Sequence, residues 1–505
     1  MASKTNTNII EIPPAGGYDA TPIPSAPDGY TIKFTIHRAE NLPRSDLTTK
    51  FSDPYVIATL KSDLPRRHDS DPDMEIRTPT IHNSVNPQWE TQWIVAGIPS
   101  TGFKLKCRIY DEDQADRDDR LGNVTLLVDR VKTGWPGIKY NSFTIKKRVG
   151  SKRAYILHGC TAIMDQNINF DGFLFLSAEL IGKSEKPYGR MYTIGPAFYF
   201  KHYSPLIGLL AGTKVPKDSK NYGKDHIEKY DFQANQLQLE GPVPAELYHR
   251  FVEFRPFVKG LFDKTGIRGH ILNIVLHHQH RRIYNYSSTT EYGIFKPCSE
   301  EASMQFLTMV HFDDGWRTFT YVLTLDGLLR FTETGKEFGI DLLSKHTMHS
   351  DVSVYIACSG EFLIRRRHHH STQESQKTDS RSSDSSRDLK NFTLIIDNDS
   401  GTYRPKSDLL PLLKRFLNKN FPGLHIQIKD CMDKDHIEMK KEQRERKKLN
   451  GYQVQMVLDS DGEIDSSDEE NLVKRYNGGD GKRERIYAAL EDPKKAIKEI
   501  IEKGL

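Results

Sequence analysis

The chain has 505 residues, of which 37% are hydrophobic and 28% are charged. This length exceeds what a single hydrophobic core organises, so we expect a globular protein of roughly two to four domains. The longest apolar stretch, residues 206–211, is too short to cross a bilayer. The net charge of +4 is too small to identify a partner by itself, so partners have to be inferred from local clusters, and no nucleic acid is expected.

The first residues contain no apolar run of the kind that a secretory leader needs. The five cysteines are scattered along the chain and form no Cys-x-x-Cys pair. Both features favour reduced thiols in the cytosol. We therefore expect a cytoplasmic protein.

Residues 1–27 are rich in proline and glycine and are expected to form a disordered leader. From Tyr30 onward, apolar and polar residues alternate in short runs between turn signals, which is typical of half-buried strands. These runs continue to about residue 183 and predict an antiparallel β-sandwich over residues 28–183. Trp89 and Trp93 stand at the start of one such run, and we expect them in the sandwich core rather than in a membrane.

Two acidic loops border strands of this sandwich. The first loop leads into the strand that begins at Asp53-Pro-Tyr-Val56, and the second follows the strand of residues 104–110. Carboxylates that gather at strand ends suit a hard cation, which takes about six to eight oxygen ligands.

Four motifs occur in an order that resembles the C2 domain family. They are Asp53-Pro-Tyr-Val56, Asn86-Pro-Gln-Trp-Glu90, the run Asp111-x-Asp113-x5-Asp119, and Leu121-Gly122. The resemblance covers about a third of the chain. It implies an eight-stranded sandwich whose loops at one end bind calcium and then anionic phospholipid.

The resemblance also implies a site. The expected Ca2+ ligands are five carboxylates: Asp46, Asp53, Asp111, Asp113 and Asp119. The gap between the first two is one residue longer than the family leads us to expect. Gln114-Ala115 stands where many members carry a bulky apolar residue, which favours shallow, electrostatic docking.

Three cations alternate along one expected strand, namely Lys104, Lys106 and Arg108. In the C2 family such a face can bind phosphoinositide headgroups. The alternative is an ordinary solvated strand face without a ligand.

The rest of the chain is expected to form two further regions and a tail. We expect residues 184–303 to be mixed and mostly helical, with a helix over residues 244–254 that proline begins. The histidines at 277, 278 and 280 lack nearby partners for a metal, so a polar surface or an anion-binding patch is the preferred interpretation. Residues 304–458 are expected to form an α/β domain, and residues 459–505 a charged C-terminal tail.

Within the α/β domain, an apolar strand over residues 392–397, a helix over residues 409–416 and a strand over residues 425–428 predict a βαβ unit. A polar insertion at about residues 368–390 is expected to be disordered. A charged helix is expected over residues 435–448. In outline, the fold class is a multidomain protein with an N-terminal all-β sandwich, a mixed region and an α/β domain.

Three functions remain open at this point. The first is calcium-dependent binding to anionic phospholipid membranes, with the later domains recruited as cargo. The second is an enzyme whose site lies at the Asp397-Asn-Asp-Ser-Gly401 turn, just past a buried strand. The third is a calcium-independent scaffold with protein partners at the C-terminal region.

We favour the first function, with peripheral membrane association and Ca2+ as the cofactor. The sequence contains no nucleophile elbow, P-loop or zinc-protease motif, so no catalytic residues are assigned and an enzyme is the less favoured hypothesis. The order of segments also resembles that of multidomain C2 proteins of filamentous fungi, which implies an architecture and no particular activity.

Overall fold

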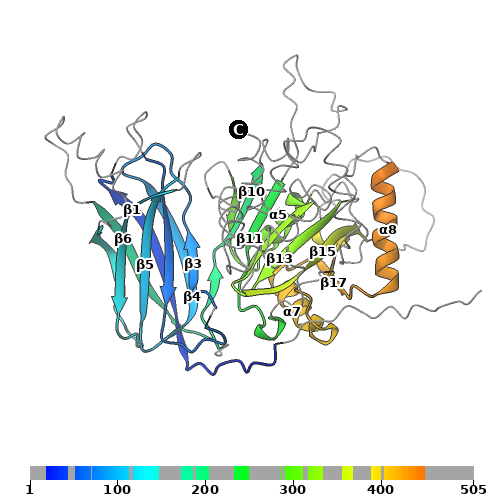
Figure 1. The fold of residues 1–505 in the computed structure, drawn as a ribbon, viewed down its shortest axis with the longest axis horizontal. Helices are drawn as coiled ribbons and strands as arrows, with labels where there is room; N and C mark the ends of the chain where they lie inside the picture. The colour runs from blue at the N-terminus through cyan, green and yellow to red at the C-terminus, as the bar shows by residue number, and fades with distance from the viewer. Residues whose placement is uncertain are drawn as a thin grey trace, which may run out of the picture.

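The computed structural model describes residues 19–43, 52–69, 71–112, 118–146, 172–185, 189–203, 233–248, 286, 290–310, 317–333, 355–367, 388–399 and 403–449. The described chain forms two bodies side by side, a β-sandwich and a larger mixed sheet with helices (Figure 1). In the described residues, no helix is both long and apolar enough to span a membrane.

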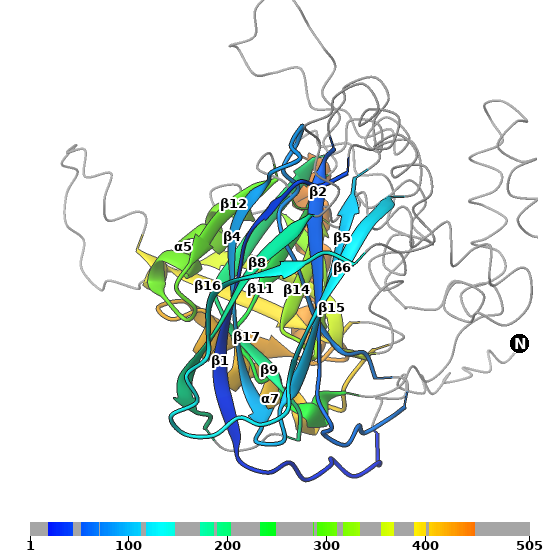
Figure 2. The same ribbon diagram turned by 90° about the vertical axis from the view of Figure 1, so that its left-hand side faces the viewer.

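The sandwich has one five-stranded and one four-stranded antiparallel sheet. The first sheet has the order β7 (Ile138–Thr144), β8 (Phe173–Lys183), β1 (Gly29–Glu40), β4 (Gln88–Pro99) and β9 (Tyr192–Gly195). The second has the order β3 (Met74–Arg77), β2 (Pro54–Lys61), β5 (Phe103–Asp111) and β6 (Asp119–Val128). Figure 2 shows these strands running the length of the body.

The sandwich forms because its strands alternate apolar and polar residues, so that the apolar sides of both sheets face each other. Phe34 shows this packing, since its ring lies 5.9 Å from Trp93 and 5.3 Å from Phe103. Trp89 and Trp93 are only 8% and 3% exposed. The prediction that they belong to the core is confirmed.

The second body is built on an eight-stranded sheet. Its order is β12 (Glu291–Phe295), β10 (Ala197–Tyr203), β11 (Gln233–Gln238), β14 (Leu328–Glu333), β13 (Thr318–Thr324), β15 (Ile356–Arg366), β16 (Phe392–Asp397) and β17 (His425–Lys429). All neighbouring strands are antiparallel except β16 and β17, which are parallel.

Two helices cover one face of this sheet with apolar side chains. They are α5 (Glu300–Met309), which Ser299 caps by accepting a hydrogen bond from the Ala302 amide, and α7 (Leu410–Asn420). Phe306 of α5 packs against Phe362 of β15 with a ring distance of 5.8 Å. A third helix, α8 (Lys434–Leu449), stands at the end of the sheet farthest from the sandwich (Figure 1). The described residues also form three short 3-10 helices, Ala245–Leu247, Leu389–Asn391 and Ser407–Leu409.

Several expectations agree with this architecture. β16, α7 and β17 form the predicted βαβ unit, and α8 is the predicted charged helix. The described part of residues 184–303 differs from the expected helical region, because it contains four strands, one 3-10 turn and the beginning of α5. The helix expected over residues 244–254 is described only to residue 248, where it is limited to that 3-10 turn.

The mixed sheet crosses one of the expected domain boundaries. β11, from the expected mixed region, pairs with β14, from the expected α/β domain, so one sheet crosses residues 303 and 304. Residues 19–27, placed in the disordered leader, carry Asp19, which accepts a hydrogen bond from Arg67 of the sandwich. The expected insertion at about 368–390 lies outside the described residues up to residue 387, and the tail over residues 459–505 lies wholly outside them.

Candidate functional site

Three of the five expected calcium ligands lie at the ends of neighbouring strands, where these strands meet at one end of the four-stranded sheet. Asp53 directly precedes β2, Asp111 ends β5 and Asp119 begins β6. In the sheet register, Asp111 pairs with Pro54 on one side and with Asp119 on the other. The strand order β2-β5-β6 therefore brings together residues that are up to 66 positions apart in the sequence. Asp46 and Asp113 lie outside the described residues.

Hydrogen bonds hold the acidic residues at these strand ends in place. The Asp53 backbone amide donates to Asp111 Oδ1 at 2.5 Å, and Asp111 is only 2% exposed. Asp53 Oδ1 accepts from the Asn83 amide at 2.7 Å, and its Oδ2 lies 3.2 Å from His82 Nδ1. Asp111 thus positions the first acidic loop as well as presenting a carboxylate of its own.

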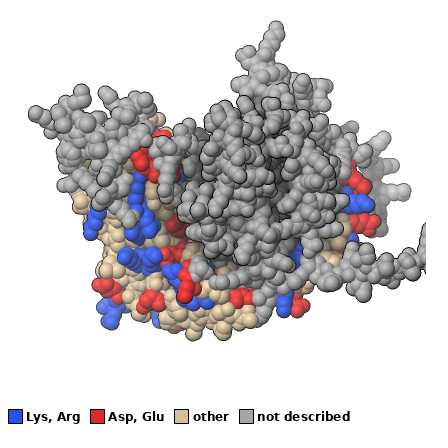
Figure 3. All heavy atoms as spheres, viewed as in Figure 1, with Lys and Arg blue, Asp and Glu red and all other residues tan. Residues whose placement is uncertain are grey.

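The three expected cations lie on the outward face of β5. Lys104 is exposed and Lys106 and Arg108 are half-buried, while the residues between them are in the core. Arg108 Nη1 donates to Thr59 Oγ1 of β2 at 2.6 Å. Lys61 of β2 stands directly opposite Lys104 in the register. Figure 3 shows Lys and Arg side chains gathered on the sandwich, with Asp and Glu side chains beside them.

A second cluster of ionisable groups is buried in the mixed sheet. Lys440 Nζ of α8 lies 2.5 Å from Glu361 Oε2, 3.1 Å from Asp397 Oδ2 and 2.6 Å from Asp399 Oδ2. His436, one turn earlier in α8, places Nε2 2.6 Å from the same Asp397 oxygen. We call these five residues the buried charge network.

Asp397 is the centre of this network. Its Oδ1 accepts from the backbone amides of Glu361 and Asp399 at 2.7 and 2.9 Å. Burial raises the pKa of Asp397, but the charge of Lys440 and the hydrogen bond from His436 outweigh burial and hold this pKa below its usual range. For Lys440, burial lowers the pKa, and the three carboxylates more than compensate and raise it above its ordinary value. The carboxylate and the ammonium group therefore stay charged near neutral pH.

The carboxylates of this network are close enough to hold a cation, because ligand oxygens of Glu361, Asp397 and Asp399 lie within 4.8 Å of one another. A divalent ion does not fit while α8 is in place, since Lys440 Nζ already lies within 3.1 Å of all three. A substrate would also need access, yet Asp397 and Glu361 are at most 1% exposed. With α8 docked, the network serves to hold the helix.

The cysteines of the described chain are poor nucleophiles. Burial raises the pKa of each of the four to about 12; they are Cys107, Cys298, Cys358 and Cys431. A thiolate is the reactive form of cysteine. These side chains are therefore protonated at neutral pH, which disfavours thiol chemistry at these positions.

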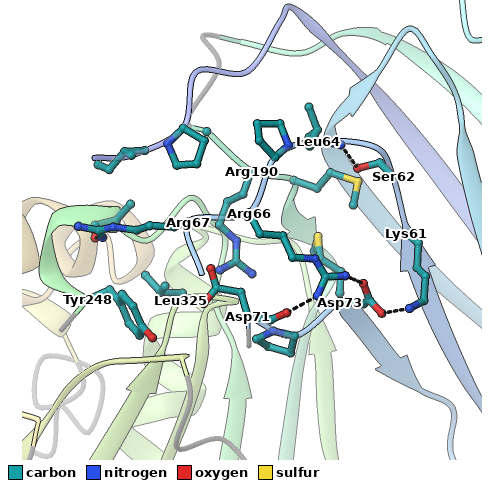
Figure 4. A pocket seen from close by; sticks show the side chains of 18 of the residues that line it. Lys61, Ser62, Leu64, Arg66, Arg67, Asp71, Asp73, Arg190, Tyr248 and Leu325 are labelled. Carbon is teal, nitrogen blue, oxygen red and sulfur yellow. Dashed lines mark hydrogen bonds and ion pairs between the residues drawn. The ribbon is translucent and has the colours of Figure 1, made fainter. Parts of the chain in front are cut away.

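The two bodies meet at a polar junction. Arg67, from the loop between β2 and β3, donates to the carbonyl oxygens of Thr21, Asp19 and Ala245 at 2.9, 2.8 and 2.8 Å. Arg190 forms an ion pair with Asp326 across the same junction. A cavity of about 90 Å³ lies between these groups (Figure 4). One arginine thus joins the N-terminal segment, the sandwich and the second body.

The sequence indicated only part of these sites. The position of the Asp397–Asp399 turn after a buried strand indicates a candidate site, but the local sequence does not indicate its partners. His436 and Lys440 are four residues apart and so share one face of a helix. That spacing is the signal in the sequence, which predicts only a charged helix over residues 435–448.

Comparison with known proteins shows which family the sandwich resembles. Residues 30–140 match the family model described as the C2 domain. Over 132 residues the chain is 30% identical to E3 ubiquitin-protein ligase Nedd-4 of Drosophila melanogaster, a match covering 25% of this chain and 12% of that protein. Over 123 residues it is 28% identical to the Calcium-dependent lipid-binding protein of Arabidopsis thaliana, covering 24% of this chain and 22% of that protein.

The chain is also 32% identical over 101 residues to human Ras GTPase-activating protein 4B, covering 20% of this chain and 11% of that protein. Each match thus spans less than a quarter of the relative's own length. Among solved structures, the C2A domain of plant Extended Synaptotagmin 1 is 18% identical with a TM-score of 0.22, and covers 31% of this chain and 97% of that domain. Human GIVD cytosolic phospholipase A2 is 18% identical with a TM-score of 0.21, and covers 35% of this chain and 19% of that chain.

Proposed function

The chain carries a C2 domain, and we propose that this domain binds anionic phospholipid membranes in a calcium-dependent manner and recruits the attached second body. The observation that carries the proposal is the convergence of Asp53, Asp111 and Asp119 on three adjacent strand ends. Asp46 and Asp113 would complete the set of ligands. One Arabidopsis relative named as a calcium-dependent lipid-binding protein supports the same function.

The mechanism follows from charge. Without calcium, the carboxylates at the strand ends repel an anionic leaflet. Ca2+ held by Asp53, Asp111 and Asp119 would reverse the local sign and attract the anionic oxygens of phospholipid. The protein thereby associates peripherally with the membrane.

The basic face supplies a second attraction. Lys104, Lys106 and Arg108 lie side by side on the outward face of β5, with Lys61 opposite the first of them. Each cation near an anionic surface contributes about 1 kcal/mol, and salt screens this attraction. We propose that this face contacts anionic headgroups once calcium has brought the domain to the membrane.

Sedimentation of the full chain with phosphatidylserine vesicles, with calcium or with a chelator, tests the proposal. We expect binding only with calcium, and loss of that binding in Asp119→Asn, which removes one carboxylate from the strand end. Asp129→Asn is the matched control, because Asp129 is exposed just beyond the opposite end of the same strand. This variant should sediment like the unchanged chain.

Two outcomes would redirect the interpretation. Equal binding with calcium and with chelator would contradict the calcium switch and leave the basic face as the membrane contact. No binding in either condition would favour the calcium-independent scaffold.

The enzyme hypothesis keeps one supporting observation, the charged groups at the Asp397 turn. It would require α8 to move before a substrate could reach them.

A further inference from the structure

The helix α8 is attached to its sheet in an unusual way. The buried side chains on its described part are His436, Lys440 and Gln443, which follow one another at spacings of four and three residues and therefore share a face. Ile437, the neighbour of His436, is 46% exposed. The three hydrophobic clusters among the described residues contain no residue of α8. The helix is thus docked by polar contacts rather than by apolar packing.

The other two α-helices described in this body, α5 and α7, differ in this respect. α5 buries Phe306 and Leu307, and α7 buries Leu413 and Leu417, in the same hydrophobic cluster. Apolar burial stabilises a docked helix in any charge state, because it depends on area removed from water. The attachment of α8 lacks this contribution in its described part.

The attachment depends instead on Lys440. Its ammonium group lies between Glu361 of β15 and the Asp397 and Asp399 carboxylates at the end of β16. A buried ion pair contributes little net stability, since the desolvation of both charges offsets their attraction. Removing one partner is nevertheless costly, because the other charges remain buried without compensation. Detachment of α8 would relieve that cost by returning the carboxylates to water.

The residues that precede α8 are held by contacts of their own. The Cys431 amide donates to Asn398 Oδ1 at 2.8 Å, and Asp433 forms an ion pair with Lys429 of β17 at 2.8 Å. Asp433 Oδ1 also accepts from the His436 amide at 3.2 Å and holds the first turn of α8. These contacts hold the residues before α8 through Asn398, Lys429 and Asp433, which lie outside the buried charge network.

We propose that α8 is a detachable strap that the buried charge network holds over the carboxyl ends of β16 and β17. Open α/β sheets bind their ligands at the carboxyl ends of strands. Glu361, Asp397 and Asp399 face solvent there when α8 is released. The strap thus controls access to an acidic edge of the second body, separately from membrane binding by the C2 domain.

Hydrogen–deuterium exchange on the full chain tests this inference, with Lys440→Met as the main variant. Methionine keeps an unbranched side chain and removes the charge. An isolated charged helix of this length is marginal in water, so amides of α8 should exchange at least about tenfold faster than in the unchanged chain. Amides of β13, β15 and β16 should keep their protection. Lys441→Met is the matched control, because Lys441 is the exposed neighbour on the same helix, and should leave exchange unchanged.

Two results would overturn the inference. Unchanged protection of α8 in Lys440→Met would show that contacts other than the network hold the helix. Loss of protection throughout the sheet would show that α8 belongs to the global core. Should Lys440→Met fail to fold, Asp399→Asn provides a milder variant, since this side chain is 15% exposed. It should raise exchange in α8 alone, and a uniform increase would contradict the strap.

Discussion

Arg67→Lys should loosen the junction between the two bodies although it keeps the positive charge. The guanidinium group of Arg67 donates to three carbonyl oxygens, two in the N-terminal segment and one, that of Ala245, in the second body. A lysine ammonium is a compact charge without the planar fork, so it cannot reach all three directions. We expect it to retain one of the three bonds.

The expected cost follows from the bonds that are lost. A hydrogen bond to a charged group contributes about 1.5 kcal/mol at the low end of its usual range, so two lost bonds amount to about 3 kcal/mol. In a domain of 150 to 250 residues, each kcal/mol lowers the unfolding midpoint by roughly 2–4 °C. The midpoint of the sandwich should therefore fall by about 6–12 °C.

Tryptophan fluorescence during thermal unfolding of the full chain measures this change. The described tryptophans, Trp89, Trp93 and Trp135, all lie in the sandwich and report on its unfolding. Arg66→Lys is the matched control, because the neighbouring Arg66 is 42% exposed and pairs with Asp73 at the surface, where an ion pair contributes at most about 1 kcal/mol. Equal midpoints for the two variants would refute the reasoning.

Two further predictions concern single groups. Burial raises the pKa of Asp19, but the hydrogen bonds from His68 and Thr21 and the charge of Arg67 outweigh burial and lower this pKa to about 2. The stabilisation that Asp19 contributes is therefore complete above its unfolded pKa of about 3.9. It is lost as the pH falls toward 2. Stability measured between pH 5 and pH 2 should therefore fall less steeply in Asp19→Asn, and an unchanged slope would contradict this assignment. Gly360→Ala should destabilise the second body by about 1–3 kcal/mol, because a Cβ there would lie 2.3 Å from the Asp397 carbonyl oxygen. Gly182→Ala, with nothing within 4 Å of its Cβ, should leave the denaturation midpoint unchanged, and an equal effect of both changes would exclude the steric explanation.

The sequence by itself determined the local structure of both bodies. Polar residues such as Lys104 and Lys106 alternate with apolar residues along the chain. This alternation specified strands with one buried side, because successive side chains in a strand point to opposite faces. The apolar run of β16 and the amphipathic spacing of α7 specified the βαβ unit in the same way. The acidic residues Asp53, Asp111 and Asp119 were expected at strand ends, and the structure places them there.

Only the tertiary structure decided which distant segments meet. The pairing of β11 with β14 joins the regions of residues 184–303 and 304–458, which the sequence predicts to be separate. Strand pairing depends on long-range contacts that no local pattern encodes. The sequence of α8 predicts a charged helix without specifying partners, whereas the structure buries Lys440 among three carboxylates. A lysine is buried when opposite charges from other elements compensate its desolvation. Those charges come from β15 and from the turn after β16, which only the folded sheet brings to α8.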